Sequence, residues 1–277
     1  MSYIDLQATL ADWPYDSEQI SVRKILGNDG SVRIQMRVEL GVLQMESQGC
    51  PDGSKPHGCE SEMAYHRRKL AKFEECNGTT AGYVITPQQC QGLRTEASLY
   101  YRRYVALFVL EEFEDVIRDT DHTLAVFDLC REFAHDEEDR TCLESFRPYV
   151  LMMNARARAL QADRDGDNTS AIAHVNRGIM HIKSHLELHE IPDMIEPPEE
   201  LRMLRALGKE LALDKSVELN SRPKPATFYP RAGLEKRVAP GSGHHPPRTR
   251  TPPKRPAIIL PDTFCLSWRL LQSGHRR

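Results

Sequence analysis

The stretch LESFRPYVLMMNARARALQADRDGDNTSAIAHVNRGIMHIKSHLELH, residues 143–189, decides the fold class of this 277-residue chain. Its apolar residues recur in steps of three and four on both sides of an acidic turn at 163–168. Such steps place side chains on one face of an α-helix, so the stretch predicts two amphipathic helices packed as an antiparallel hairpin. The apolar positions are Leu143, Phe146, Val150, Met153, Ala157 and Leu160 before the turn, and Ile172, Val175, Ile179, Ile182, Leu186 and His189 after it.

A second helical hairpin is predicted upstream, over residues 93–133, with the same apolar spacing. Thr86 followed by Pro87 is typical of a helix start, because threonine caps the first turn and proline fits the first helical position. A fifth helix is expected to open at the prolines and acids of 196–200 and to fade near Asn220. The sequence therefore predicts a mainly α protein whose helical-hairpin domain spans 86–219.

Residues 1–85 predict a small α+β module ahead of the helices. In Ser31–Leu40 apolar and polar residues alternate with a period of two, which indicates a half-buried strand. Ile20–Leu26 alternates less cleanly, and the intervening Gly27–Gly30 supplies residues that tolerate a tight turn. We expect a β-hairpin within residues 20–45, followed by a short helix over 60–75.

The C-terminal segment, 220–277, differs from the rest in composition. It holds ten of the 18 prolines and 12 Lys/Arg against two acids, a net charge of +10, whereas residues 1–219 carry −13. Such a segment buries too little apolar surface to offset the entropy of ordering, so it is expected to be a disordered, basic, Pro/Arg-rich tail. The abrupt change is also typical of a GC-rich gene read out of frame, and both origins stay open.

The cysteines and the N-terminal sequence indicate the cellular compartment of the protein. The seven cysteines are odd in number and widely spread, and the acidic N-terminal stretch has no apolar signal region. No run approaches the 18 or so apolar residues of a membrane span. We expect reduced thiols in a cytoplasmic protein, with no membrane as partner.

The two hairpins resemble tetratricopeptide repeats, in which small residues lie where two helices cross. The matching residues of the second hairpin are Ala155, Ala159, Gly166-Asp167, Ala171-Ile172 and Gly178, and those of the first are Tyr100, Tyr104, Phe113, Val116-Ile117 and Leu124. Val116 and Ala171 are 55 residues apart, where tandem repeats are offset by about 34. The resemblance implies a bundle of antiparallel hairpins that binds a protein partner.

A wider resemblance covers 37–46, the loop at 49–58 and the helical region. In order, these segments are similar to bacterial proteins of unknown function that carry a UvrB/UvrC-type (UVR) helical hairpin near the C-terminus. In those proteins the UVR hairpin follows the helix that corresponds to 201–219. Here that position holds proline-rich sequence. The resemblance implies an association with nucleic acid or DNA repair.

The leading functional hypothesis is a non-enzymatic interaction or scaffold protein. The sequence contains no Gly-rich phosphate loop and no Gly-x-Ser-x-Gly elbow, so no catalytic residue is predicted. A groove beside the helical hairpins is expected to receive a protein partner. The candidate contacts are Tyr100, Tyr101, Arg102, Arg103 and Tyr104.

The first alternative is a nucleic-acid-associated protein. The predicted β-hairpin carries Arg23, Lys24, Arg33 and Arg37, and the tail adds further positive charge. Contacts from such residues to phosphates would be independent of base sequence and sensitive to salt.

The second alternative is metal binding, although no cofactor is the default expectation. Cys50, His57 and Cys59 could approach one another in a flexible loop and bind zinc, but the paired Cys-x-x-Cys spacing of zinc knuckles is absent. His181 and His185 are four residues apart on a predicted helix, the spacing at which two imidazoles can grip one ion.

Overall fold

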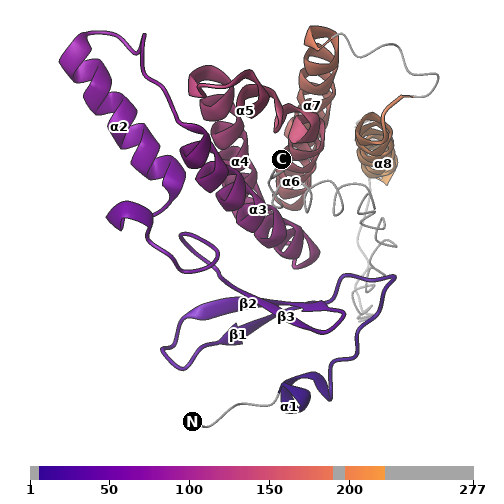
Figure 1. Ribbon diagram of the computed structural model, residues 1–277. Helices are drawn as coiled ribbons and strands as arrows, with labels where there is room; N and C mark the ends of the chain where they lie inside the picture. Colours follow the sequence, from indigo (N-terminus) through magenta and orange to yellow (C-terminus); the bar gives the residue numbers. More distant parts are fainter. Residues whose placement is uncertain (1–5, 190–196, 222–277) are drawn as a thin grey trace, which may run out of the picture.

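The computed structural model describes residues 6–189 and 197–221, and this part is mainly α-helical, as the sequence predicts. Helix α4 packs between α3 and α6, and α7 packs between α6 and α8 (Figure 1). These long helices are α3 (Pro87–Val109), α4 (Phe113–Phe133), α6 (Arg147–Arg164), α7 (Asn168–Leu188) and α8 (Glu199–Ser221). No described helix combines the length needed to span a bilayer with a sufficiently apolar sequence. The predicted tail, 222–277, lies outside the described residues.

Shorter elements surround this stack of helices. Helix α2 (Glu62–Asn77) precedes α3 and corresponds to the helix expected over 60–75. The others are α1 (Gln7–Leu10), η1 (Pro56–Gly58), α5 (Glu137–Thr141) and η2 (Glu144–Phe146).

Side-chain caps fix where the long helices begin. At the start of α3, Thr86 Oγ1 accepts a hydrogen bond from the Gln89 N–H, and Gln89 Oε1 accepts one from the Thr86 N–H at 3.0 Å. This capping box, with Pro87 at the first position, confirms the predicted helix start. Before α7, Gly166 adopts φ +80°, and the Asp167 carboxylate accepts from the Ser170 N–H at 3.0 Å.

The predicted β-hairpin is present and has a third strand. Strands β1 (Val22–Leu26), β2 (Val32–Val38) and β3 (Gly41–Glu46) form an antiparallel sheet in the order β1-β2-β3. The alternation in the sequence includes Leu40 as a strand residue, but the chain reverses there and Leu40 is 93% exposed. The period of two continues across the reversal, so the pattern alone does not locate this turn.

The sheet packs on the helices through one of its faces. Ile34 pairs with Lys24 on one side and Met45 on the other, which places these three side chains on the face toward α3. Ile34, Met45 and Met63 of α2 belong to the same buried cluster as the helical residues. One hydrophobic core therefore runs across the boundary predicted at residues 85/86.

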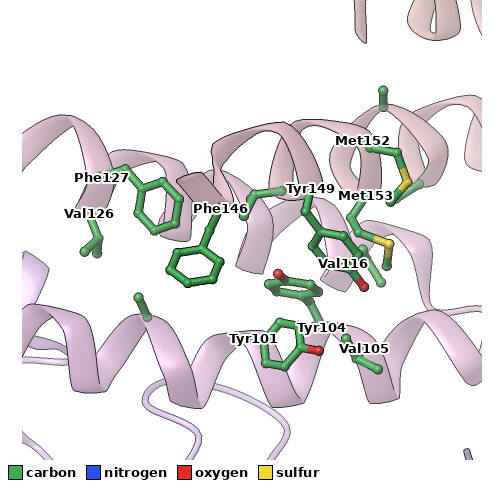
Figure 2. Packing of buried hydrophobic residues seen from close by; sticks show 14 of the residues in the cluster. Tyr101, Tyr104, Val105, Val116, Val126, Phe127, Phe146, Tyr149, Met152 and Met153 are labelled. Carbon is green, nitrogen blue, oxygen red and sulfur yellow. The ribbon is translucent and has the colours of Figure 1, made fainter. Parts of the chain in front are cut away.

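Aromatic and sulfur-containing side chains fill the space between α3 and α6. Figure 2 shows Tyr101 and Tyr104 of α3 pointing toward Tyr149 and Met153 of α6. The ring of Tyr101 meets those of Tyr104 and Tyr149 edge-on, with centroids 5.5 and 6.2 Å apart. Edge-to-face contacts of this kind add to the free energy gained by burying the rings.

Small residues allow α6, α7 and α8 to approach closely. A Cβ added at Gly178 of α7 would lie 2.4 Å from Ala155 Cβ and 3.2 Å from Leu204 Cδ1. The close approach of α6 and α8 to α7 therefore depends on a missing side chain.

We predict that Gly178→Ala destabilises the protein despite the higher helix propensity of alanine. Overpacking costs about 1–3 kcal/mol, whereas the propensity gain is about 1 kcal/mol. Urea denaturation should show a lower midpoint for Gly178→Ala. Asn176→Ala, on the exposed side of α7, is the matched control and should not lower it. A Gly178→Ala protein at least as stable as wild type would contradict the packing described.

Candidate functional site

The residues predicted to contact a partner lie on α3, and four of the five are buried. Tyr100, Tyr101, Arg103 and Tyr104 are in the interior, and Arg102 is half-buried. These four side chains have almost no surface to offer a partner, which corrects the prediction. The reason is that α3 is covered by the sheet, α2, α4 and α6. The sequence pattern of an aromatic stripe is the same whether the stripe faces a groove or a core.

Arg103 and Asp119 form a buried ion pair between α3 and α4. Arg103 Nε donates to Asp119 Oδ2 at 2.7 Å, and Nη2 donates to Oδ1 at 2.9 Å. The two side chains are 1% and 0% exposed. Two parallel charge-assisted hydrogen bonds are the strongest arrangement available to an arginine and a carboxylate. Arg118 Nε adds a third hydrogen bond to Oδ1 at 3.0 Å.

The same face of α3 holds the loop that follows β3, residues 46–49. Arg103 Nη1 donates to the main-chain oxygens of Glu46 at 3.1 Å and Gly49 at 2.7 Å. The Tyr100 hydroxyl donates to the Gly49 oxygen at 3.3 Å. Burial raises the pKa of Tyr100 above its usual range, so this hydroxyl keeps its proton and remains a donor. Loop 46–49 is therefore bound through its backbone.

Glu96 extends these contacts to α2. Its buried carboxylate accepts hydrogen bonds from the Glu62 N–H and, at 3.1 Å, from the Met63 N–H, both in the first turn of α2. A negative charge is favourable at a helix N-terminus. Glu96 Oε1 also lies 2.8 Å from His122 Nε2 of α4, and the His122 ring stacks on Tyr100 with centroids 3.8 Å apart.

Together these five residues form a buried polar centre that joins four segments of the chain. The buried polar centre consists of Glu96, Tyr100, Arg103, Asp119 and His122. Its charged groups are paired with protein groups, and four of its five side chains are in the interior. This arrangement fits a structural junction better than a site for chemistry on a ligand.

The basic residues predicted to bind nucleic acid do not share one face of the sheet. Arg23, Arg33 and Arg37 lie on the face away from α3, whereas Lys24 faces the helices, because neighbouring residues of a strand point to opposite sides. All four have partners within the protein. The contacts are Arg23 to Gln35 and Trp13, Lys24 to Glu112, Arg33 to Asp29 and Glu46, and Arg37 to the main-chain oxygens of Trp13 and Gly41.

The predicted Cys–His zinc ligands are separate within the described residues. Cys50 is buried, and its burial raises the pKa of the thiol to about 11, which disfavours the thiolate that zinc binds. His57 stacks on Tyr65 with centroids 3.9 Å apart, and the Cys59 thiol points at the His57 carbonyl. Within the described residues, Cys50, His57 and Cys59 do not form a cluster of three ligand atoms.

Of the predicted pair of His181 and His185, only His185 belongs to a cluster of three ligand residues among the described residues. His181 is exposed, whereas His185 is buried beside Glu144 of η2 and His189, which follows α7. Their ligand atoms all lie within 4.8 Å of one another. Burial lowers the pKa of His185, which favours the neutral imidazole. The four-residue spacing of His185 and His189 is visible in the sequence, but nothing there links Glu144 to them.

No protein-family model, curated protein or solved structure matches this chain.

Breaking the Arg103–Asp119 pair should destabilise the protein strongly. Arg103→Met keeps the length of the side chain but leaves the Asp119 charge buried, with Arg118 as its only charged partner among the described contacts. Loss of one partner of a buried pair costs about 3–5 kcal/mol. Arg102→Met, at the adjacent half-buried position of α3, should cost under about 1 kcal/mol. Equal free energies of unfolding for the two variants would contradict the assignment.

His66 of α2 makes stability depend on pH. Both ring nitrogens are buried without a hydrogen-bond partner within the described residues. Burial, with smaller effects from Lys69 and His57, lowers the pKa of His66 from 6.5 to about 4. Between these values the unfolded chain binds a proton that the folded protein does not. Stability from this group is therefore complete above pH 6.5 and is lost as the pH falls toward about 4.

Replacing His66 by Phe, a planar ring that does not titrate, should remove this contribution to the pH dependence. Melting temperature measured from neutral pH down to about pH 4 should fall less steeply in His66→Phe than in wild type. His181→Gln, on the exposed side of α7, serves as the control and should follow wild type. The same slope in all three proteins would rule out the assignment to His66.

Proposed function

We propose that this chain is a non-enzymatic interaction protein in which the stack of α3, α4, α6, α7 and α8 is the scaffold. The observation that carries the proposal is the way α3 holds loop 46–49. Arg103 and Tyr100 donate to main-chain oxygens of this loop, and contacts of this kind bind a segment irrespective of its side chains. Two of the five residues predicted to bind a partner thus bind a segment of the same chain.

A partner would have to use a surface that the chain itself leaves open. Among the described residues, the outer side of α7 is such a surface, since Met180 is 56% exposed and Leu188 is 72% exposed. They are eight residues apart on one helix, which places them on the same side of it. Arg177, Lys183 and Glu187 are exposed among them. Apolar residues rimmed by charges of both signs favour a protein partner over a polyanion.

Nucleic acid is the less favoured partner for the described residues. Each arginine of the sheet is already engaged by carboxylates, an amide or main-chain oxygens. Binding phosphates there would require these contacts to be replaced. The positive charge of 220–277 lies entirely outside the described residues.

A photo-crosslinking amino acid placed at Met180 or Leu188 in the full chain tests the proposal in cells. We expect discrete protein adducts from both positions. A probe at Lys72, on the exposed side of α2, is the control and should not give the same adducts. A second exchange, Arg177→Glu, should weaken the adducts of the Met180 probe without changing the melting temperature.

Two results would overturn the proposal. One is the same set of adducts from the Lys72 control as from the two α7 probes. The other is adducts from the α7 probes that disappear on nuclease treatment, which would assign this face to nucleic acid instead.

A further inference from the structure

Glu144, His185 and His189 converge from two separate elements at the C-terminal end of α7. Glu144 Oε2 lies 3.7 Å from His185 Nδ1 and 3.8 Å from His189 Nε2. The two imidazole rings are 4.4 Å apart between centroids and are tilted by 49°. Glu144 and His185 are buried, whereas His189 is 31% exposed, so the group is reached from one side.

These separations are close to those of ligands around one metal ion. Zinc binds imidazole nitrogen and carboxylate oxygen at about 2.0–2.2 Å, so its ligands in a tetrahedron lie roughly 3.3–3.6 Å apart. Glu144 Oε2 is within a few tenths of an ångström of this spacing from both imidazole nitrogens. All three ligand atoms lie within 4.8 Å of one another, so an ion would draw the two imidazole nitrogens closer together.

The surroundings hold Glu144 in position for such a role. Arg147 Nε and Nη2 donate to its two carboxylate oxygens at 2.6 and 2.7 Å. Arg147 Nη1 also lies 3.0 Å from Asp128 Oδ1, so the guanidinium is shared between two carboxylates. Hydrogen bonds to a ligating carboxylate orient it and are a regular feature of metal sites. Arg147 thus fixes Glu144, while Asp128 balances the positive charge of Arg147.

We propose that Glu144, His185 and His189 form a site for a first-row transition metal ion of the zinc type. Two imidazoles and one carboxylate select zinc, cobalt or nickel over calcium and magnesium, which take oxygen ligands. Three protein ligands leave a coordination position for water on the exposed side of His189. The ion would join the end of α7 to η2, which immediately precedes α6. Binding a metal ion goes beyond a scaffold role. In this site His189 and Glu144, rather than the predicted His181, are the ligands beside His185.

Cobalt(II) is the probe for this site, because its spectrum distinguishes nitrogen and oxygen ligands from thiolates in a chain with seven cysteines. The purified full chain, stripped with a chelator, is titrated with cobalt(II). We expect one equivalent to bind with d–d bands and without a thiolate charge-transfer band. Zinc should displace it, and zinc should raise the melting temperature.

His189→Ala is the decisive variant, because the side chain is partly exposed and its loss should leave the fold intact, as checked by circular dichroism. We expect its affinity for cobalt(II) to fall at least about 10-fold. His181→Ala, one turn before His185 and exposed, is the matched control and should bind like wild type. Glu144→Gln should also weaken binding.

Three results would overturn the proposal. The first is a wild-type chain that binds no cobalt(II). The second is equal affinity in His189→Ala and His181→Ala. The third is a spectrum dominated by thiolate charge transfer that neither histidine variant changes, which would place the ion on cysteines.

Discussion

The ion pair between Arg103 and Asp119 is the contact on which the arrangement of this chain depends. Two buried charges lose their hydration, and only good geometry with further hydrogen bonds compensates for this loss. Here the compensation comes from outside the pair as well as within it. Loop 46–49 supplies two main-chain oxygens to Arg103, and Arg118 supplies a donor to Asp119. The pair is therefore well satisfied only when the sheet, α3 and α4 are all in place.

Much of the fold could be predicted from the sequence because the relevant signals are local. Thr86 and Pro87 mark a helix start through contacts within four residues, and the alternation of Ser31–Leu40 reports a strand directly. The site could not be predicted in the same way. Arg103 and Asp119 are 16 residues apart, and Glu144 and His185 are 41 residues apart. Their pairing depends on how helices pack, which no local pattern records.

The aromatic stripe of α3 shows the limit of periodicity as evidence. Spacing of three and four says that Tyr100 and Tyr104 share a side of a helix, but not what covers that side. The N-terminal sheet covers one side of α3, and α4 and α6 cover another. A helix buried on several sides carries buried charged residues such as Arg103 among its apolar ones. In a sequence such residues look like surface positions.

Loop 46–49 is held by its main-chain oxygens, and this has a consequence for how the chain can change in evolution. Ser47 and Gln48 lie between Glu46 and Gly49, whose main-chain oxygens accept the hydrogen bonds from Arg103. These bonds do not involve the side chains of residues 47 and 48. Gly49 is different, since its φ of +65° favours glycine. Gln48 is also constrained, because its Oε1 accepts a hydrogen bond from Arg118 Nη1 at 3.0 Å. Homologous chains could thus diversify most freely at position 47 while the geometry of the junction stays constant.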